Sequence, residues 1–384
     1  MKILLYTTDL FKGREYLMPW RTVLEVAKGM HNLGHSVIII NGINESKYLT
    51  YASPHVPIRN IRKSLRTLAQ VVQETQADIL FMECKWRDAL KNFTPLKKIP
   101  CKKYVYFTGG IYDLSSIKTL SKLNGVKNAR NYWMEILTPK PLLTFRLKQM
   151  HFNGAIGLTP FTTQEIKKNG YTNAITILPG KDNFEKLHSD NSILQKYLLT
   201  NKKFLCFTGA PAPTRGAQLL LQAINNSPIA DLRVVFLMRT DVGSEYTTFD
   251  SIYKKMKNSS KVIIIKDQLT REQLKSFFEN AWYMILPFVV IPSEIPLTFF
   301  EIMSCRTPIL TFKNGGTSNY LRNGLFISPK SIEGLSKGIT EVWTNQQLRE
   351  EKAKQAKELM MLHPTWPEVA EQWLNYISQE SPKL

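Results

Sequence analysis

The sequence predicts an α/β fold made of two doubly wound domains in tandem. At 384 residues the chain exceeds the length at which a single core usually stops growing. Short apolar runs alternate with amphipathic helical stretches, which is typical of parallel sheets covered by helices. This alternation starts again half-way along the chain. With 43% hydrophobic and 21% charged residues, the composition is that of an ordinary globular protein.

The first half opens with a strand, "KILLYTT", at residues 2–8. Apolar residues at helical spacing follow over residues 20–34, and Gly34 supplies the expected C-terminal cap. The next strand is "HSVIIING" at residues 35–42. Further strands are expected at "DILFMEC", "KKYVYFTGG" and "GAIGLTP". Successive strands joined by helices predict right-handed crossovers and a parallel sheet.

The pattern restarts with a strand at residues 204–208, a Gly/Pro-rich loop and a helix from about residue 217. The later strands are expected at "LRVVFLM", "SKVIIIKD", "WYMILPF" and "TPILTF". The polar segment 177–191 joins the two halves. We therefore expect a first domain at 1–180, a second at 181–363, and a C-terminal helix at 364–384 that completes the first domain.

Several classes of protein are disfavoured. The start "MKILLYTTDL" lacks the long apolar core and cleavage site of a signal peptide. The longest apolar run, "AWYMILPFVVI", is too short to span a bilayer. The four cysteines lie far apart, in no zinc-binding or disulfide spacing: Cys84, Cys101, Cys206 and Cys305. These features predict a cytoplasmic protein with reduced thiols.

The net charge of +20 is unevenly distributed. Residues 1–180 hold 26 Lys and Arg against 11 Asp and Glu, a net charge of +15, whereas residues 181–384 hold 25 against 20, a net charge of +5. A basic half favours a polyanionic partner such as an anionic lipid surface, a phosphorylated substrate or nucleic acid. A lysine-rich solvated surface would give the same counts.

Ligands of doubly wound sheets bind beyond the carboxyl ends of the strands, so two such domains predict a shared cleft. The loop 208–218, "TGAPAPTRGAQ", follows a strand and leads into a helix. Its Gly209, Gly216 and Arg215 combine helix N-terminal amides with a guanidinium, which suits a phosphate or diphosphate. An ordinary strand-to-helix turn with a surface arginine fits the same residues.

A second loop of this kind is "FKNGGTSNYLRNG", at residues 312–324. Gly316, with Gly315 before it, allows the backbone to approach a ligand closely. Thr317 and Ser318 are expected to cap the next helix and to donate to an anion. A tight loop with a plain N-cap is the simpler interpretation.

Two glutamates bracket the apolar start of a predicted helix in "IPSEIPLTFFEIMSCRTP". Glu301, among Phe299, Phe300 and Met303, would be costly to bury alone and needs a hydroxyl, an arginine or an amide as partner. A ribose offers two hydroxyls. Glu294 lies at or before the helix start, where the helix dipole favours an anion. Either glutamate could also serve the fold alone.

Taken together, these segments resemble a GT-B glycosyltransferase, and most of all glycosyltransferase family 4, also called group 1. The opening strand, helix and "GHSVIII" strand resemble the start of that family, and "ILPGKD" resembles its "IPNGVD" join. "FTGAPAPTRGAQLLLQAI" resembles "G-R-x-x-x-x-K-G-x-x-x-L-L-x-A". "SEIPLTFFEIMSCRTPILTFKNGG" resembles "EG-x-P-L-x-x-L-E-A-M-A-x-G-x-P-V-V-x-x-x-x-GG".

The resemblance implies two Rossmann-like domains facing a central cleft, with Glu301 on the ribose of the donor. The family has seven residues between its glutamates and this chain has six, so either Glu294 or Ser293 takes the earlier place, at the transferred sugar or its phosphate. Arg215 replaces the family's lysine. Arg239, at a strand end, is a candidate for the family arginine that Ala210 replaces. Gly13 stands in the first loop, where the family often has two glycines.

We therefore expect a hexosyltransferase-like enzyme that moves a sugar from a nucleotide-sugar to a glycan or lipid-linked acceptor hydroxyl. The resemblance implies retention of anomeric configuration. The nucleotide-sugar is a substrate, no cofactor is expected, and the absence of a DxD sequence predicts no metal. The basic first domain would dock on the anionic inner face of the membrane through residues 58–66, 96–103 and 118–148. Alternatives are a non-catalytic GT-B binding protein and a GT-B epimerase or phosphorylase. Nucleic acid is not expected, because no recognition motif accompanies the charge.

Overall fold

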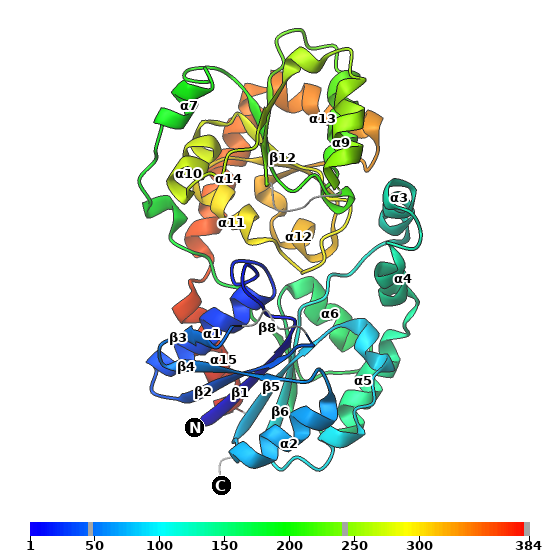
Figure 1. Cartoon of the computed structure of the whole chain (residues 1–384), viewed down its shortest axis with the longest axis vertical. Coiled ribbons are helices and arrows are strands. Elements are labelled where there is room, and N and C mark those ends of the chain that lie inside the picture. The colour runs from blue at the N-terminus through cyan, green and yellow to red at the C-terminus, as the bar shows by residue number, and fades with distance from the viewer. Residues whose placement is uncertain (45–48, 240–244, 380–384) are drawn as a thin grey trace.

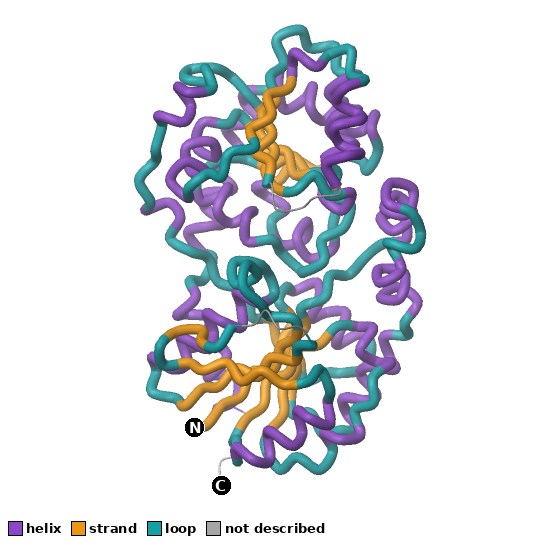
Figure 2. The backbone as a smooth tube through the Cα atoms, viewed as in Figure 1, coloured by secondary structure: helices purple, strands orange, loops and turns teal. Residues whose placement is uncertain are grey.

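The computed structural model describes residues 1–44, 49–239 and 245–379, and these form two stacked domains (Figure 1). In each domain a twisted sheet is covered by helices on its faces (Figure 2). Both sheets are parallel apart from one short edge strand, as the alternation of strands and helices predicts. The change from one sheet to the other falls between residues 176 and 205.

The first sheet has eight strands within the described residues. In spatial order they are β3 (Tyr51–Ser53), β4 (Val56–Ile61), β2 (Ser36–Gly42), β1 (Lys2–Thr8), β5 (Ile79–Cys84), β6 (Lys102–Phe107), β7 (Gly154–Gly157) and β8 (Ala174–Thr176). Its helices are α1 (Trp20–Asn32), α2 (Leu65–Thr75), α3 (Leu114–Asn124), α4 (Arg130–Leu137), α5 (Lys140–Gln149) and α6 (Pro160–Lys168). The antiparallel pair is β3 with β4.

The second sheet has six strands within the described residues, all parallel. In spatial order they are β11 (Val262–Ile265), β10 (Val234–Met238), β9 (Leu205–Gly209), β12 (Tyr283–Leu286), β13 (Ile309–Phe312) and β14 (Leu325–Ser328). Its helices are α7 (Ser192–Lys196), α8 (Ala217–Asn225), α9 (Glu245–Lys254), α10 (Arg271–Asn280), α11 (Leu297–Ser304), α12 (Gly315–Tyr320), α13 (Ile332–Thr344) and α14 (Gln346–Leu362).

Strand β1 shows why these runs are apolar throughout. Leu4 and Tyr6 pack on one face of the sheet, while Ile3 and Leu5 pack on the other. Successive side chains of a strand point to opposite faces, and helices cover both faces, so every position of a central strand is buried. The second sheet is likewise enclosed by two apolar clusters.

The two halves of the chain exchange elements. Helix α15 (Trp366–Gln379) returns from the second domain and packs along α1, with Ala370 against Gly29. In the other direction, residues 110–137, here called the strap, leave the first domain and carry α3 and α4 onto the second (Figure 1). Ile117, Leu120 and Ala129 of the strap are fully buried in the core cluster of the second domain. Residues 380–384 of the expected C-terminal helix lie outside the described residues.

The chain passes between the domains at residues 177–184 and again at 362–366, and these two crossings run side by side. The Lys181 amide donates to the Pro364 carbonyl at 2.9 Å, and Lys181 pairs with Thr365 in a parallel bridge. The buried His363 joins both, since its Nε2 contacts the Pro179 carbonyl at 2.8 Å. Burial lowers the pKa of His363 to about 4, so the ring is neutral and Nε2 carries the proton that it donates.

Candidate functional site

The loop between β9 and α8 is a strand-to-helix turn, at the position where the sequence predicts one. Gly209 and Gly216 both have positive φ, at 125° and 70°. A Cβ on Gly216 would lie 2.1 Å from the Pro287 carbonyl oxygen, and one on Gly209 would lie 2.7 Å from Nη1 of Arg215. Both positions therefore require glycine, because the loop packs against the segment after β12 and wraps the arginine.

Arg215 lies in a short 3-10 turn, Pro213–Arg215, at the carboxyl edge of the second sheet. Its guanidinium stacks over the Phe288 ring, 5.1 Å from the centroid. Arg239 follows the neighbouring strand β10, and its amide donates to the Gly209 carbonyl at 3.4 Å. The structure thus brings these two cations to adjacent strand ends, as expected, with Arg239 the more exposed. Residues 240–244, which follow it, lie outside the described part.

Glu294 makes an unexpected contact with the first domain. Its carboxylate accepts hydrogen bonds from Thr159 Oγ1 at 2.7 Å and from Thr162 Oγ1, at the N-terminus of α6. The residue is 3% exposed, and burial raises its pKa to about 7 although the two hydroxyls oppose the shift. Of the two roles that the sequence left open, a cap for α11 and a contact with the transferred sugar, the structure shows neither, because the carboxylate faces Thr159 and Thr162 of the first domain.

The carboxylate of Glu294 also covers Gly316. A Cβ on Gly316 would lie 2.3 Å from Oε2 of Glu294, so only glycine allows this approach. The pocket that remains here, between Gly110, Tyr112 and Gly315, measures about 10 Å³, enough for one water molecule at most. Ser293 lies half-buried beside it. Protein atoms therefore fill the cleft at the place predicted for the transferred sugar.

Thr317 and Ser318 do not cap the next helix, contrary to the sequence prediction. Helix α12 begins at Gly315, so both residues lie within it. The Thr317 hydroxyl donates to the Glu294 carbonyl at 2.6 Å. The Ser318 hydroxyl accepts from the Asn314 amide at 2.7 Å and lies 3.4 Å from the Phe312 carbonyl. Local backbone groups therefore engage both hydroxyls.

Glu301 has an arginine as its partner, one of the three kinds of group that its burial predicts. Oε1 lies 3.7 Å from Nη2 of Arg271, the first residue of α10. The same guanidinium is 3.0 Å from Asp182, which also pairs with Arg21 of α1. Burial raises the pKa of Glu301 to about 7, and Arg271 opposes that shift. The side chain is 27% exposed, so a ligand can reach it.

The first domain carries a polar cluster that the sequence analysis missed. Glu83 of β5 accepts from Thr7 Oγ1 at 2.7 Å and from Thr108 Oγ1 at 2.9 Å, and Lys85 Nζ lies 3.1 Å away. Burial alone would raise the pKa of Glu83, but Lys85 and the hydroxyls outweigh it and lower that pKa. Polar residues that end three apolar strands were the available signal. This cluster marks the cleft edge of the first domain.

Gly13 lies in the loop after β1, which is also at the cleft edge of the first sheet. Its φ of 95° requires glycine-like freedom, yet no atom lies within 4 Å of a Cβ placed there. Its amide donates to the Glu15 carboxylate. Conformation rather than close packing therefore explains this glycine.

Solved structures with this arrangement of domains are glycosyltransferases and related proteins. Sucrose-phosphate synthase from Thermosynechococcus elongatus aligns with a TM-score of 0.73 at 13% identity, over 99% of this chain and 98% of that one. Anabaena Alr3699/HepE, in complex with UDP and glucose, aligns with a TM-score of 0.68 at 14% identity, over 99% and 100%. The apo lipopolysaccharide outer core galactosyltransferase WaaB aligns with a TM-score of 0.69 at 11% identity, over 99% and 100%.

The sequence itself gives a family match in the second domain. Residues 189–359 match the family described as glycosyl transferases group 1. The chain has the GT-B fold, and its second domain resembles group 1. The expected fold class is thereby confirmed, and the match supports sugar transfer as the class of reaction. No curated protein matches this sequence closely enough to count as a relative.

Within 1–44, 49–239 and 245–379, no group of three or more His, Cys, Asp and Glu side chains is placed to hold a metal ion. None of the helices in this part of the chain combines the length and apolar character that crossing a bilayer requires.

Proposed function

We propose that this GT-B protein transfers a hexosyl group from a nucleotide-sugar to an acceptor hydroxyl, as a step in the synthesis of a cell-surface glycan, polysaccharide or glycolipid. The observation that carries the proposal is the glycine loop 209–216, which holds Arg215 at the carboxyl edge of the second sheet. A fixed cation at a helix N-terminus is suited to the diphosphate of such a donor.

The donor would lie on the second domain. In this proposal Glu301 accepts hydrogen bonds from the ribose hydroxyls. The ion pair between Glu301 and Arg271 would break when the nucleotide binds. Arg215 and the amides at the start of α8 stabilise the charge on the departing diphosphate, with Arg239 as a second cation. Because these groups supply positive charge where charge develops, the proposal needs no divalent cation. To make room for the donor sugar, Glu294 would have to leave Thr159 and Thr162. Retention of the anomeric configuration is proposed from the resemblance to group 1.

The acceptor would lie on the first domain, beside the Glu83 cluster. Lys85 and the hydroxyls of Thr7 and Thr108 are placed at the ends of three neighbouring strands, so an acceptor bound there faces the donor edge across the cleft. The printed name of WaaB refers to lipopolysaccharide, a lipid-linked glycan, which is consistent with this acceptor class.

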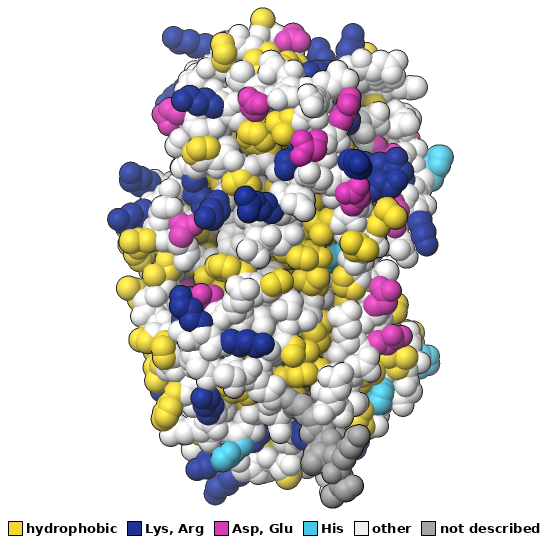
Figure 3. Space-filling model, turned by 180° about the vertical axis from the view of Figure 1, so that it is seen from behind, with side chains coloured by type: hydrophobic (Ala, Val, Ile, Leu, Met, Phe, Trp, Pro, Cys, Tyr) yellow, Lys and Arg dark blue, Asp and Glu magenta, His cyan; other side chains and the backbone are white. Residues whose placement is uncertain are grey.

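We further propose that the protein works at the inner face of the membrane as a peripheral protein in the cytoplasm. The basic first domain supports this, since Arg62 and Arg66 are exposed, and so is the apolar side chain of Phe145 in the same domain. On the face seen in Figure 3, Lys and Arg are spread over both domains among Asp and Glu, so that face offers no single basic patch.

The structure removes several residues from the contacts first expected with lipid. Lys103 is 4% exposed and donates to the Leu96 carbonyl, and Leu143 is fully buried. Tyr132 and Trp133 of the strap pack against the core of the second domain. These side chains hold the fold together and are not available to a headgroup layer.

Screening nucleotide-sugars by thermal shift and then following turnover by NMR tests the enzyme. We expect one class of nucleotide-sugar to raise the thermal midpoint of the protein. Turnover should continue when EDTA is present, and the product should keep the donor's anomeric configuration. If no nucleotide-sugar binds, the donor assignment is wrong. Binding without transfer or hydrolysis would favour a non-catalytic binding protein. The hydrogen bonds of Glu294 with Thr159 and Thr162 are also consistent with that alternative, because they occupy the place proposed for the transferred sugar.

Sedimentation with liposomes tests the membrane site separately. We expect the protein to bind vesicles that contain anionic lipid, to release them as salt rises, and to bind less when Arg62 and Arg66 are changed to Glu. A protein that stays in the supernatant at low salt would remove the membrane proposal and leave the transferase proposal intact.

A further inference from the structure

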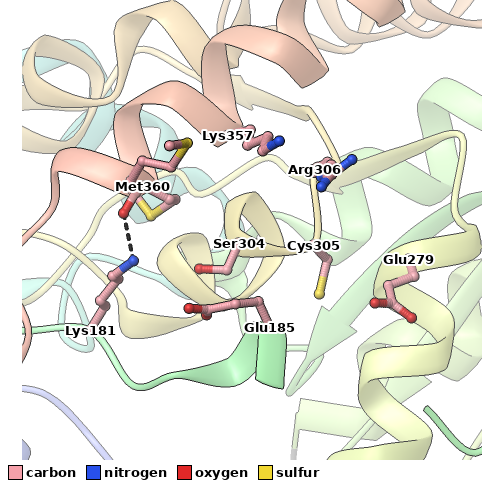
Figure 4. Close-up of a pocket in the computed structure, with 9 residues that line it drawn as sticks. Lys181, Glu185, Glu279, Ser304, Cys305, Arg306, Lys357 and Met360 are labelled. Atoms are coloured by element: carbon pink, nitrogen blue, oxygen red, sulfur yellow. Dashed lines mark hydrogen bonds between the residues drawn. The ribbon is translucent and has the colours of Figure 1, made fainter. Parts of the chain in front are cut away.

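A well-formed cavity lies beside the first crossing, on the side of the second domain away from the proposed donor loops. It measures about 530 Å³, within the range of small-molecule sites. Figure 4 shows its walls, which come from four parts of the chain. The lining residues are Lys181, Glu185, Glu279, Ser304, Cys305, Arg306, Lys357, Met360 and Met361. We call this cavity the hinge pocket.

The hinge pocket is distinct from the proposed donor site. Cys305 and Arg306 precede β13, so they lie towards the amino ends of the strands, whereas the donor loops follow the carboxyl ends. Lys181 belongs to the first crossing, and Met360 lies just before the second. Nζ of Lys181 donates to the Met360 carbonyl at 2.6 Å, which closes one wall of the pocket (Figure 4).

Two cations of the pocket lack a protein partner. Within the described residues, the side chains of Arg306 and Lys357 make no hydrogen bond or ion pair, although carboxylates of Glu185 and Glu279 line the same cavity. Glu279 is already paired with Lys275 at 3.1 Å. A ligand with a negative group could therefore use both cations without displacing a protein contact.

Arg306 adopts an unusual conformation to reach the pocket. Its φ of 60° lies in the left-handed region that favours glycine. The group 1 pattern "E-A-M-A-x-G-x-P" has glycine at this place, where the chain reads "EIMSCRTP". The chain thus carries a guanidinium at the edge of an open cavity, in a backbone conformation that glycine would adopt without strain.

Ser304 is a second departure at the same wall, because the pattern has alanine there. Its Oγ is buried and has no hydrogen-bond partner within the described residues. Buried hydroxyls are normally satisfied, so this one calls for a partner that the protein does not supply. Cations, carboxylates and a hydroxyl thus line one cavity, and no aromatic ring is among the lining residues to stack on a base.

We propose that the hinge pocket binds a small anionic polyol of the size and chemistry of a sugar phosphate. Its phosphate would lie between Arg306 and Lys357, and its hydroxyls would donate to Glu185 and Glu279 and pair with Ser304. The pocket is lined by Lys181 of the first crossing and by Met360 and Met361, which lie just before the second, so its ligand would bind next to both connections between the domains. This site does not depend on the transferase proposal.

Isothermal titration calorimetry with glucose 6-phosphate tests the site, using glucose, inorganic phosphate and UDP as comparison ligands. We expect glucose 6-phosphate to bind at least tenfold more tightly than either of its parts. Arg306→Gly, which restores the residue of the pattern, and Lys357→Ala should each weaken binding at least tenfold. Lys354→Ala is the matched control, since Lys354 lies on the same helix, outside the pocket and 78% exposed; it should bind like wild type.

Three results would overturn the proposal. Unchanged binding in Arg306→Gly would place the ligand elsewhere. Competition by UDP together with loss of binding in Arg215→Ala would assign the ligand to the donor loop. Equal affinity for inorganic phosphate would reduce the site to an anion site without polyol recognition. Because the readout is binding alone, these results are independent of whether sugar transfer is found.

Discussion

The cleft and the hinge pocket differ in what fills them. At the cleft, Glu294 crosses to Thr159 and Thr162, and the pocket beside it measures about 10 Å³. At the hinge pocket, about 530 Å³ stays open, and the side chains of Arg306 and Lys357 make no hydrogen bond or ion pair with any described residue. The open cavity is therefore not the one that strand topology marks for the substrate.

This difference shows that a protein's own side chains can occupy the positions that a ligand's groups would take. Glu294 accepts from two hydroxyls, and Glu301 pairs with a guanidinium. Buried carboxylates need partners, so in the closed form the protein supplies them itself. In the hinge pocket no protein group does the same for Ser304 Oγ, within the described residues. The predictions below separate the two regions.

The largest effect is expected from Arg215→Ala. Removal of a preorganised charge that stabilises the leaving group should lower kcat by about 10²- to 10³-fold. Arg239→Ala is the comparison, and its effect should be smaller because Arg239 is more exposed and lies only at a strand end. Steady-state kinetics with the identified donor measure both. Equal losses would mean that the two cations share the diphosphate.

Glu301→Ala should weaken nucleotide binding by about 10- to 100-fold, since hydrogen bonds to a charged group contribute roughly 1.5–3 kcal/mol. Calorimetry with the free nucleotide measures this without any turnover. The thermal midpoint of the unliganded variant checks that the fold is retained. A variant that binds the nucleotide as wild type does would contradict the ribose assignment.

Glu294→Gln should change how stability depends on pH. The pKa of Glu294 is raised to about 7 in the folded protein from 4.5, so the folded state holds a proton that the unfolded chain releases between these values. This contribution is complete below pH 4.5 and is lost as pH rises through 7. At pH 8 the variant should therefore be more stable than wild type, by about 1–3 kcal/mol.

Thermal midpoints at pH 5 and pH 8 measure the effect of Glu294→Gln, and Glu358→Gln on the exposed face of α14 serves as control. The gain should be confined to pH 8, where the wild-type carboxylate is charged. An equal shift at both pH values would indicate a packing effect, and would argue against a buried charge at the cleft.

The smallest effect is expected from Arg306→Gly on stability. Glycine relieves the left-handed strain of about 1 kcal/mol but loses about as much through the greater freedom of the unfolded chain. The two contributions nearly cancel, so the thermal midpoint should move by less than 2 °C. A large fall would show that the guanidinium supports the fold, and would weaken the case for a ligand.

Long central strands such as β1 and β5 could be predicted from the sequence because both faces are buried and the runs are apolar. The four strands that were missed, β3, β4, β8 and β14, have three to six residues each, and β4 contains a proline. Runs this short are too brief for the alternation of apolar and polar residues to be recognised. The position of the glycine loop and of Arg215 between a strand and a helix could also be predicted, since a strand-to-helix turn is determined by the local sequence.

The partners of Glu294 could not be predicted, because Thr159 and Thr162 lie 135 and 132 residues away and in the other domain. The same holds for the Glu83 cluster, which needs three strand ends brought together. Thr317 and Ser318 were misplaced because the helix starts on glycine at Gly315, which lacks the side chain that marks an N-cap. Tertiary contact decided each of these positions.

The paired crossings also restrict the geometry of domain motion. Two adjacent backbone segments, tied at Lys181 and His363, define one axis, so the domains can turn about that line but cannot slide apart along it. Displacement in a rotation grows with distance from the axis. The strap lies on the far side of the molecule in Figure 1 and therefore travels farthest for a given angle.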